Sequence, residues 1–238
     1  MCPTYNRPEL LAECLYWFTK QTEYERSEFL ILADGPQKLV CNDPRVTILW
    51  YPNRIPTLGL KRNLLIDAAQ GEILIPQDDD DISLPHRAKQ AEEKLENAEF
   101  FDPRARWYEE GGRLHWTHAQ NCTFHAAAWR RGTLRFREDR SGDADQAATQ
   151  DARKLGLRHA PGLTRPAEWS YVYRWGVSRW HFSAQPGGGQ FDPSQPTADT
   201  FLLVPTLRKP YDSLCRGIAH VAATADLLSP EATTRAAG

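Results

Sequence analysis

Three short, nearly unbroken apolar runs stand out in the first half of the chain. They are Phe29–Ala33, Val46–Trp50 and Glu72–Ile75. Runs of this length are typical of strands that are buried on both faces. The first run ends at Asp34, where an Asp-Gly pair indicates a turn, and the third leads into four consecutive aspartates, Asp78–Asp81.

Stretches with an apolar residue at every third or fourth position separate these runs and predict helices. The first helix is expected after Pro8, which suits a first turn. A second is expected to be capped by Thr57 and ended by Gly71. Its buried stripe is predicted to be Leu60, Leu64, Leu65 and Ala68. Ser83 is expected to cap a third helix, with Pro85 in its first turn.

Strands and helices that alternate in this way predict an α/β fold, with a mixed sheet flanked by helices. Ligands of such folds bind beyond the carboxyl ends of the strands. Asp34 and the aspartate run both follow a strand, so we expect them to converge on one cleft.

The second half of the sequence is less regular. A hairpin is predicted around Gly111, and a helix is predicted to follow Ser141. Residues 171–175 and 180–182 indicate another hairpin, and residues 214–228 carry the pattern of an amphipathic helix.

Composition and charge exclude several classes of protein. The 238 residues include 41% hydrophobic and 25% charged residues, which is typical of a soluble globular chain. A net charge of −2 argues against a protein that wraps nucleic acid. No apolar run approaches the roughly 18 residues that span a bilayer, and no signal peptide opens the chain. Five scattered cysteines without a C-x-x-C pair indicate reduced thiols, so we expect a cytoplasmic protein.

The four aspartates at residues 78–81 carry the strongest chemical signal. Adjacent carboxylates repel one another, so a buried cluster needs a cation to offset its charge. Oxygen ligands at a strand end suit Mg²⁺ or Mn²⁺, which take further ligands from a substrate phosphate. A solvated acidic loop before the third helix is the alternative, and the spacing does not fit an EF-hand.

Three residues in the first half are candidates to contact a nucleotide. Asp34 is placed to accept a hydrogen bond from a base, although an Asp-Gly pair is equally a turn. Tyr5 would stack on a base or else lie in the core. Arg62 would contact base or phosphate, or else be a solvated arginine on a helix.

Four segments resemble family 2 glycosyltransferases of the GT-A fold. They are residues 2–8 (CPTYNRP), 32–35 (LADG), 58–63 (LGLKRN) and 69–87 (AQGEILIPQDDDDISLPHR), in the family's order and spacing. The resemblance implies a Rossmann-like GT-A fold. It also implies inverting transfer of a sugar from a nucleoside-diphosphate-sugar to an acceptor hydroxyl, with a divalent metal.

The resemblance implies roles for particular residues. The contacts to the nucleotide and its diphosphate fall on Pro3, Thr4, Tyr5, Asp34, Arg62 and Asp79. The metal ligands fall on the D-x-D motif and a late histidine, namely Asp78, Asp80, Asp81 and His181. Residues 121–125 (NCTFH) resemble the family's acceptor-side strand, and residues 141–146 (SGDADQ) resemble the motif that supplies the catalytic base.

Asp145 is the favoured base and Asp143 is its competitor. Both also suit a helix N-terminus, where acidic side chains are stabilised whether or not one is catalytic.

On this basis a single GT-A domain is expected to have three parts. Residues 1–98 would form the nucleotide-sugar-binding half, residues 99–190 the acceptor-side half with the base, and residues 191–238 a loop and a C-terminal helix. The family's hydrophobic first strand is nearly absent before Pro3, so we expect either a truncated first strand or another segment in its place.

The acceptor stays open among a glycan, a lipid-linked molecule, another hydroxyl compound and nucleic acid. A basic stretch would suit an anionic acceptor, but Glu138 and Asp139 interrupt it, so a face of mixed charge is an equal alternative. The stretch comprises Arg130, Arg131, Arg135, Arg137 and Arg140. Trp107, Trp116 and Trp129 would either stack on a sugar or pack in the core.

Two other functions stay open. One is a protein that binds a sugar nucleotide without catalysing transfer. The other is a metal-dependent nucleotidyltransferase, which would need a glycine-rich phosphate loop that the segment around Tyr5 lacks.

Overall fold

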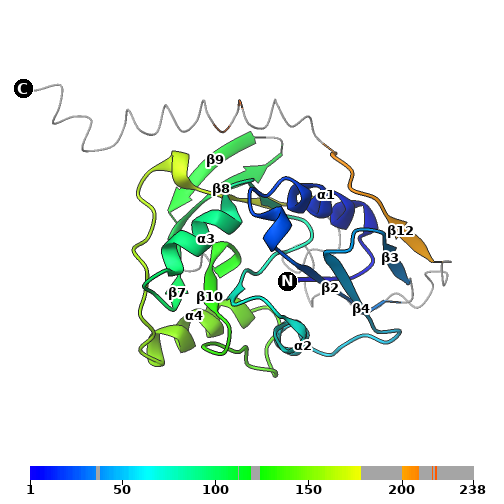
Figure 1. Cartoon of the computed structure of the whole chain (residues 1–238), viewed down its shortest axis with the longest axis horizontal. Helices are drawn as coiled ribbons and strands as arrows, with labels where there is room; N and C mark the ends of the chain where they lie inside the picture. The colour runs from blue at the N-terminus through cyan, green and yellow to red at the C-terminus, as the bar shows by residue number, and fades with distance from the viewer. Residues whose placement is uncertain are drawn as a thin grey trace, which may run out of the picture.

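The computed structural model describes residues 1–35, 38–111, 113–118, 124–177 and 200–208, with positions 216 and 218. Within these residues the chain forms a mixed α/β fold with four α-helices, which confirms the predicted fold class (Figure 1). Among them, no helix combines the length and the apolar character needed to cross a bilayer. His181, the strand expected at residues 180–182 and nearly all of the expected C-terminal helix lie outside them.

A parallel three-stranded sheet begins the fold. It consists of β1 (Cys2–Thr4), β2 (Phe29–Ala33) and β4 (Val46–Trp50), in the order β1-β2-β4. The predicted strands at β2 and β4 are therefore confirmed. Helix α1 (Pro8–Thr19) packs its apolar face against this sheet, as the pattern after Pro8 predicts. Beside it, β3 (Leu39–Cys41) pairs with β12 (Phe201–Leu203).

A second sheet joins the two halves of the chain. Its antiparallel strands are β5 (Ile73–Leu74), β10 (Ala128–Arg130) and β7 (Phe100–Phe101), so the third predicted strand is shorter than expected. Strand β1 lies next to the segment after β5, because the Met1 amino group donates to the Ile75 carbonyl at 3.0 Å and Gln77 N donates to the Met1 carbonyl at 2.9 Å. A cavity of about 650 Å³ adjoins β5. Residues of β2 and β5 line it, together with Met1.

The third sheet has four strands in the order β6-β11-β8-β9. They are β6 (Ile82–Ser83), β11 (Tyr171–Trp175), β8 (Ala105–Glu110) and β9 (Arg113–His118). β8 and β9 form the predicted hairpin. β11 instead pairs antiparallel with β6 and parallel with β8, so the described part of the second expected hairpin belongs inside a larger sheet. Trp107 and Trp129 are fully buried, which assigns both to the core.

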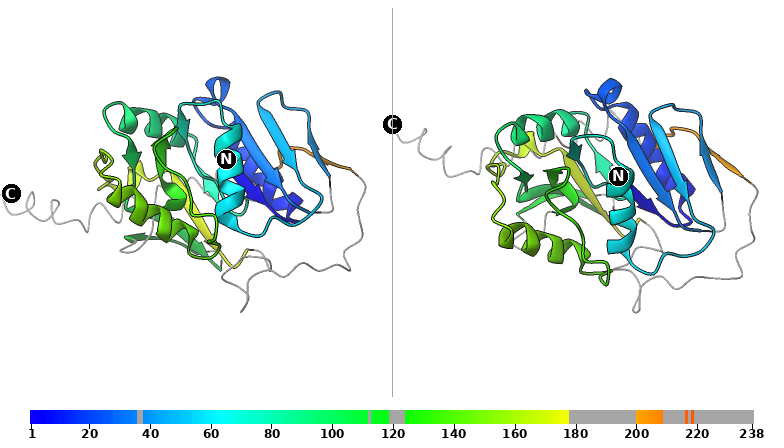
Figure 2. Two further views of the ribbon diagram at one scale, coloured as in Figure 1. Left: turned by 90° about the horizontal axis from the view of Figure 1, so that it is seen from below. Right: turned by 60° about the horizontal axis from the view of Figure 1, so that its bottom comes forward.

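Helix α2 (Leu58–Ala68) lies between the blue sheet and the green half of the molecule (Figure 2). Thr57 caps it as predicted, since its hydroxyl accepts from Leu60 N. The predicted buried stripe is only partly right. Lys61, Arg62 and Asn63 are buried, whereas three of the four predicted stripe residues, Leu60, Leu64 and Ala68, are only half-buried. These buried polar residues of α2 face the carboxyl ends of the strands, where polar side chains of other elements bind them.

Two predicted helix starts are wrong in detail. Ser83 does not cap α3 (Arg87–Leu95), because it lies in β6 and its hydroxyl contacts Gln77 and Arg87. Ser141 does not cap α4 (Ala144–Lys154); its hydroxyl accepts from Leu58 N, and Asp143 occupies the cap position without a side-chain bond.

Short 3-10 turns complete the structure. They are η1 (Tyr24–Arg26), η2 (Phe124–Ala126) and η3 (Pro166–Glu168). Phe124 and His125 were expected in a strand but belong to η2, so the expectation of a strand there is wrong for these two residues.

Candidate active site

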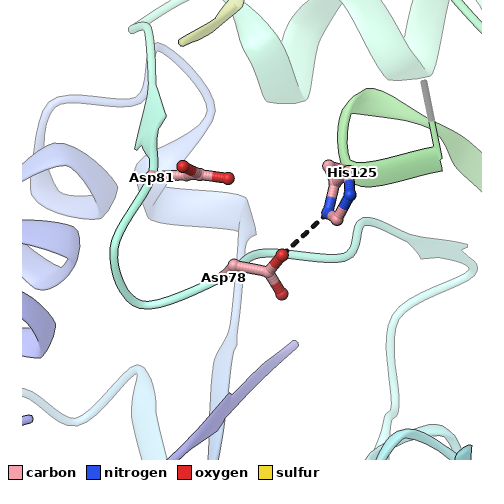
Figure 3. Close-up of side chains that lie close together, drawn as sticks. All are labelled: Asp78, Asp81 and His125. Carbon is pink, nitrogen blue, oxygen red and sulfur yellow. Dashed lines mark hydrogen bonds and ion pairs between the residues drawn. The ribbon is translucent and has the colours of Figure 1, made fainter. Parts of the chain in front are cut away.

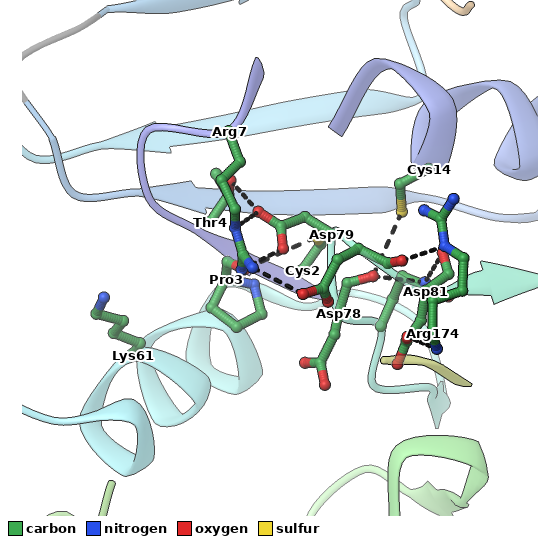
Figure 4. A network of polar contacts seen from close by, with 12 residues as sticks. Cys2, Pro3, Thr4, Arg7, Cys14, Lys61, Asp78, Asp79, Asp81 and Arg174 are labelled. Carbon is green, nitrogen blue, oxygen red and sulfur yellow. Dashed lines mark hydrogen bonds and ion pairs between the residues drawn. The ribbon is translucent and has the colours of Figure 1, made fainter. Parts of the chain in front are cut away.

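The N-terminal segment and the aspartate run meet where β1, β2 and β5 end. The Thr4 hydroxyl donates to Asp79 Oδ2 at 2.5 Å, and Arg7 Nε donates to the same oxygen at 3.0 Å (Figure 4). Arg7 Nη1 reaches Asp80 Oδ2 at 2.8 Å. These side chains meet because β1 lies beside the segment that follows β5, through the backbone bonds of Met1 to Ile75 and Gln77.

Each aspartate of the quartet has a different partner. Asp79 and Asp80 face Arg7. Asp81 accepts from the Tyr171 hydroxyl at 2.5 Å and from the backbone N–H of Arg174 at 2.7 Å. Arg174, itself 2% exposed, also donates to the backbone carbonyl of Asp80 and pairs with the buried Glu13 at 2.6 Å. Cations of the chain itself therefore offset part of the repulsion that the sequence assigns to a metal.

The remaining repulsion is visible in the pKa values. Burial, together with the neighbouring Asp80, raises the pKa of Asp79 to about 7, although Arg7 acts against it. Burial and the carboxylates of Asp80 and Asp78 raise the pKa of Asp81 well above its ordinary value. Burial would also raise the pKa of Asp78, but Arg62 and His125 outweigh it and hold this pKa far below its ordinary range. A further cation near Asp81 would favour its ionised form.

Asp78, Asp81 and His125 form a group that suits a metal ion. One ligand atom of each lies within 4.8 Å of the others (Figure 3). His125 Nδ1 lies 2.7 Å from Asp78 Oδ2. Burial lowers the pKa of His125 despite the nearby Asp78, and a neutral imidazole is the form that ligates a metal. Asp80 is not in this group, because its carboxylate faces Arg7.

The two candidate bases lie in different surroundings. Asp143 is exposed and pairs with Arg140 at 2.9 Å. Asp145, in the first turn of α4, is 8% exposed and points into the site. It forms an ion pair with Arg62 Nη1, and its Oδ2 lies 3.2 Å from His125 Nε2.

Arg62 links the two sides of the site. Its guanidinium contacts Asp145 and, at 3.1 Å, Asp78 Oδ1. Its side chain is 4% exposed, which excludes the solvated arginine considered from the sequence. The sequence does not single out His125, which touches the same two carboxylates. The signal in the sequence that could have identified His125 was its place at the end of the segment NCTFH, which resembles the family's acceptor-side strand.

Asp34, a candidate to contact the nucleotide, is surrounded by donors of the chain itself. This carboxylate is fully buried and accepts from Lys61 Nζ at 2.7 Å, Arg54 Nη1 at 3.0 Å and Ile55 N at 2.8 Å. The Arg54 guanidinium lies 3.7 Å from the centre of the Tyr5 ring. Burial lowers the pKa of Lys61 to about 8, although Asp34 acts against it. Pro3 is buried in β1, where it pairs with Leu32 of β2.

Comparison with known proteins decides the family. Residues 1–161 match the family described as Glycosyl transferase family 2. The chain belongs to glycosyl transferase family 2. No curated protein matches the sequence.

Solved glycosyltransferase structures share the fold. S. aureus TarS is similar with a TM-score of 0.57 and 16% identity, over 75% of this chain and 36% of that one. TarS 1–349 in complex with UDP gives a TM-score of 0.58 and 17% identity, over 75% of this chain and 60% of that one. The mannosyltransferase PcManGT from Pyrobaculum calidifontis, in complex with GDP-Man and Mn²⁺, gives a TM-score of 0.53 and 18% identity, over 72% of this chain and 55% of that one. The family 2 chain thus spans between 36% and 60% of the length of these relatives.

Proposed function

We propose that this chain transfers a sugar from a nucleoside-diphosphate-sugar to an acceptor hydroxyl, with inversion and with help from Mn²⁺ or Mg²⁺. The family supports glycosyl transfer. The observation that carries the finer proposal is the network of Asp78, Arg62, Asp145 and His125 at the carboxyl ends of the strands. In this network Arg62 and His125 each contact both Asp78, a candidate metal ligand, and Asp145, the candidate general base.

The metal would be held by Asp78, Asp81 and His125. Two carboxylates and one imidazole supply oxygen and nitrogen donors within 4.8 Å, which fits a divalent ion. The imidazole favours Mn²⁺ over Mg²⁺, which prefers oxygen ligands. When bound, the ion would stabilise the negative charge of the departing diphosphate. His181 remains a candidate ligand from the sequence, with Asp80.

The donor would lie over β1 and β2. The neighbouring structures are complexes with UDP-GlcNAc, UDP and GDP-Man, which supports a nucleoside-diphosphate donor. Tyr5, Asp34 and Pro3 would border the base, and Thr4 and Asp79 the diphosphate. Arg62 would form an ion pair with the diphosphate. The diphosphate would then compete with Asp145 for the Arg62 guanidinium, and the Asp145 carboxylate would become free.

Asp145 would then act as the general base. The acceptor oxygen forms the new bond to the anomeric carbon as the bond to the diphosphate breaks, and its proton passes to the Asp145 carboxylate. Asp143 is the weaker candidate, because it is exposed and faces Arg140.

A pair of matched variants tests this assignment. Asp145→Asn is expected to lower kcat by roughly 100-fold or more, the usual contribution of a general base. Asp143→Asn, two residues away, is expected to stay within about twofold of the unchanged chain. The measurement is nucleoside-diphosphate release from a donor panel with Mn²⁺ and an acceptor mixture. Equal losses of kcat in the two variants would contradict the role of Asp145 as the general base.

One observation favours a second candidate, a protein that binds sugar nucleotides without transferring the sugar. Arg7 and Arg174 already contact the aspartate run, so the quartet does not depend on a metal alone. If every donor raises the unfolding temperature but none releases nucleoside diphosphate with Mn²⁺, this candidate replaces the transferase.

A further inference from the structure

Arg87, the first residue of α3, is an arginine buried without a carboxylate at ion-pair distance among the residues that the structure describes. It is 3% exposed. Its guanidinium donates to two backbone carbonyls and to two side-chain oxygens, all of them uncharged. Burial of a cation is unfavourable unless hydrogen bonds use its donors. The four acceptors therefore account for the burial of Arg87, and their positions show what it holds together.

One nitrogen of the guanidinium joins the two sides of the candidate site. Nη2 donates to the Pro76 carbonyl at 2.7 Å and to the His125 carbonyl at 2.6 Å. Pro76 lies two residues before Asp78, and His125 lies in η2. Asp78 and His125 both belong to the metal group, although 47 residues separate them in the chain. Arg87 thus connects the backbone segments that carry two of the three candidate ligands.

The other nitrogen acts on the aspartate run through Gln77. Nη1 donates to Gln77 Oε1 at 2.9 Å and to Ser83 Oγ at 2.5 Å. The amide nitrogen of Gln77 in turn donates to the Asp78 carbonyl at 2.7 Å and to the Asp81 carbonyl at 3.2 Å. Arg87 therefore fixes the orientation of an amide that binds the first and the last aspartate of the run.

The third candidate ligand is also held beside Arg87. The guanidinium carbon lies 4.4 Å from the centre of the Tyr171 ring. The hydroxyl of this buried tyrosine donates to Asp81 Oδ2 at 2.5 Å. Arg87 therefore packs against the ring that orients the Asp81 carboxylate.

The charge of Arg87 opposes a metal ion at this group. Burial lowers the pKa of Arg87, although Tyr171, Asp81 and Asp78 act against it. A cation that interacts with these carboxylates repels a divalent ion bound to them. By charge alone, removal of Arg87 would strengthen metal binding, whereas loss of its hydrogen bonds would weaken it. The sign of the change in metal affinity therefore distinguishes the two effects.

We propose that Arg87 is a positioning residue that holds η2 and the aspartate run in the geometry of the metal group. It acts through Pro76, Gln77, Tyr171 and the backbone of His125, and it donates to none of the candidate ligand atoms. This inference rests on the metal site of the proposed function. It adds a residue on α3 to the structure that assembles the site.

Amide hydrogen exchange of the full chain without metal, measured by NMR, tests the positioning directly. Ala127 N donates to Phe124 O within η2, and Asp81 N donates to Asp78 O within the run. In Arg87→Met both amides are expected to exchange roughly 10-fold faster, because local opening becomes easier, while Leu65 N of α2 stays within about twofold. Unchanged exchange at Ala127 and Asp81, or an equal rise at Leu65, would overturn the proposal.

Calorimetry with Mn²⁺ tests the consequence for the metal group. Arg87→Met is expected to bind Mn²⁺ roughly 10-fold more weakly than the unchanged chain, the usual effect of losing a group that orients metal ligands. Arg130→Met is the matched control and is expected to stay within about twofold. Arg130 also donates to two backbone carbonyls, of Ala98 and Leu95, but outside the metal group. Equal or tighter Mn²⁺ binding by Arg87→Met would overturn the proposal.

A second variant keeps the test valid if Arg87→Met does not fold. Arg87→Lys keeps the charge and the aliphatic stem but replaces the planar fork with one ammonium group. Its Mn²⁺ affinity is expected to fall by roughly 3-fold, and exchange at Ala127 and Asp81 to rise by a similar factor. Exchange and Mn²⁺ affinity equal to those of the unchanged chain would overturn the proposal.

The exchange measurement separates this inference from the proposed function, because it needs neither metal nor donor. If the unchanged chain binds no Mn²⁺, the metal-assisted function fails, whereas faster exchange at Ala127 and Asp81 in Arg87→Met would still support the positioning role. Mn²⁺-dependent release of nucleoside diphosphate by the unchanged chain, with unchanged exchange in Arg87→Met, would support the function and overturn the inference.

Discussion

The two sides of the candidate site are built in different ways. On the donor side, Thr4 ends β1, Asp34 follows β2 and Asp78–Asp81 come after β5. Backbone bonds join β1 both to β2 and to the segment after β5. On the acceptor side, His125 lies in a 3-10 turn and Asp145 in the first turn of a helix. Side-chain ion pairs to the donor side hold both of them. Backbone pairing places the first side, whose carboxylates also form ion pairs with Arg7 and Lys61, whereas the second side is joined to the first through side-chain ion pairs.

The largest expected effect comes from breaking the buried ion pair that links α1 with β11. Glu13→Leu is expected to lower the free energy of unfolding by about 3–5 kcal/mol, because it leaves Arg174 buried without its carboxylate. Urea denaturation measures the loss. The double variant Glu13→Leu/Arg174→Leu is expected to lose less than the sum of the single variants. A loss below about 1 kcal/mol in Glu13→Leu would mean that charge does not hold β11 in place.

His125 tests the link between the acceptor side and the metal group. His125→Ala removes the contact to Asp78 and the contact to Asp145, so we expect nucleoside-diphosphate release to fall by roughly 100-fold. Mn²⁺ affinity, measured by calorimetry, is expected to fall with it. His86→Ala is the matched control, because His86 lies at the start of α3 and outside the metal group. Equal effects of the two variants would argue against a role of His125.

Lys61 tests the donor side through pH. Burial lowers its pKa to about 8 in the folded chain, against an ordinary value of 10.5. Between these values the unfolded chain binds the additional proton, so the free energy of unfolding is expected to rise with pH by on the order of 1–3 kcal/mol. Lys61→Met is expected to lack this rise. Denaturation series from pH 7.5 to 11 on both chains, at about half-unit steps, measure the difference; parallel curves would contradict it.

The smallest effect is expected outside both sides of the site. Three arginines of the basic stretch, Arg135, Arg137 and Arg140, pair with Asp67, Asp151 and Asp143. Arg135→Ala is expected to change stability by less than about 1 kcal/mol, because the pair with Asp67 is exposed. It is also expected to leave KM for the acceptor unchanged, as measured by initial rates. A tenfold rise in KM would favour an anionic acceptor on this face.

The sequence was most informative where local rules decide the structure. The apolar runs located β2 and β4, and Thr57 caps α2 as its position before an apolar stripe predicts. Long-range contacts decide the rest. Ser83 has the features of a helix cap, but it lies in β6 and pairs with Tyr171 of β11. No local sequence pattern indicates that pairing. His125 of η2 and Asp145 of α4 lie 3.2 Å apart although 20 residues separate them, and both also contact the network of Arg62 and Asp78.

The buried face of α2 shows the same limit. A periodic pattern identifies the apolar stripe but does not indicate that Lys61, Arg62 and Asn63 are buried with polar partners in Asp34, Asp78 and the backbone of Phe136. Functional sites bury polar groups in this way, so a stripe predicted from hydrophobicity alone is least reliable beside a site.

Binding of a nucleoside diphosphate with and without Mn²⁺ is the most direct test of the central claim, that a divalent ion at Asp78, Asp81 and His125 binds together with the donor. Calorimetry with UDP and GDP is expected to give at least a roughly 10-fold gain in affinity for one nucleotide when Mn²⁺ is present, and His125→Ala is expected to lose that gain. Nucleotide affinity that is the same with and without Mn²⁺ would contradict the claim.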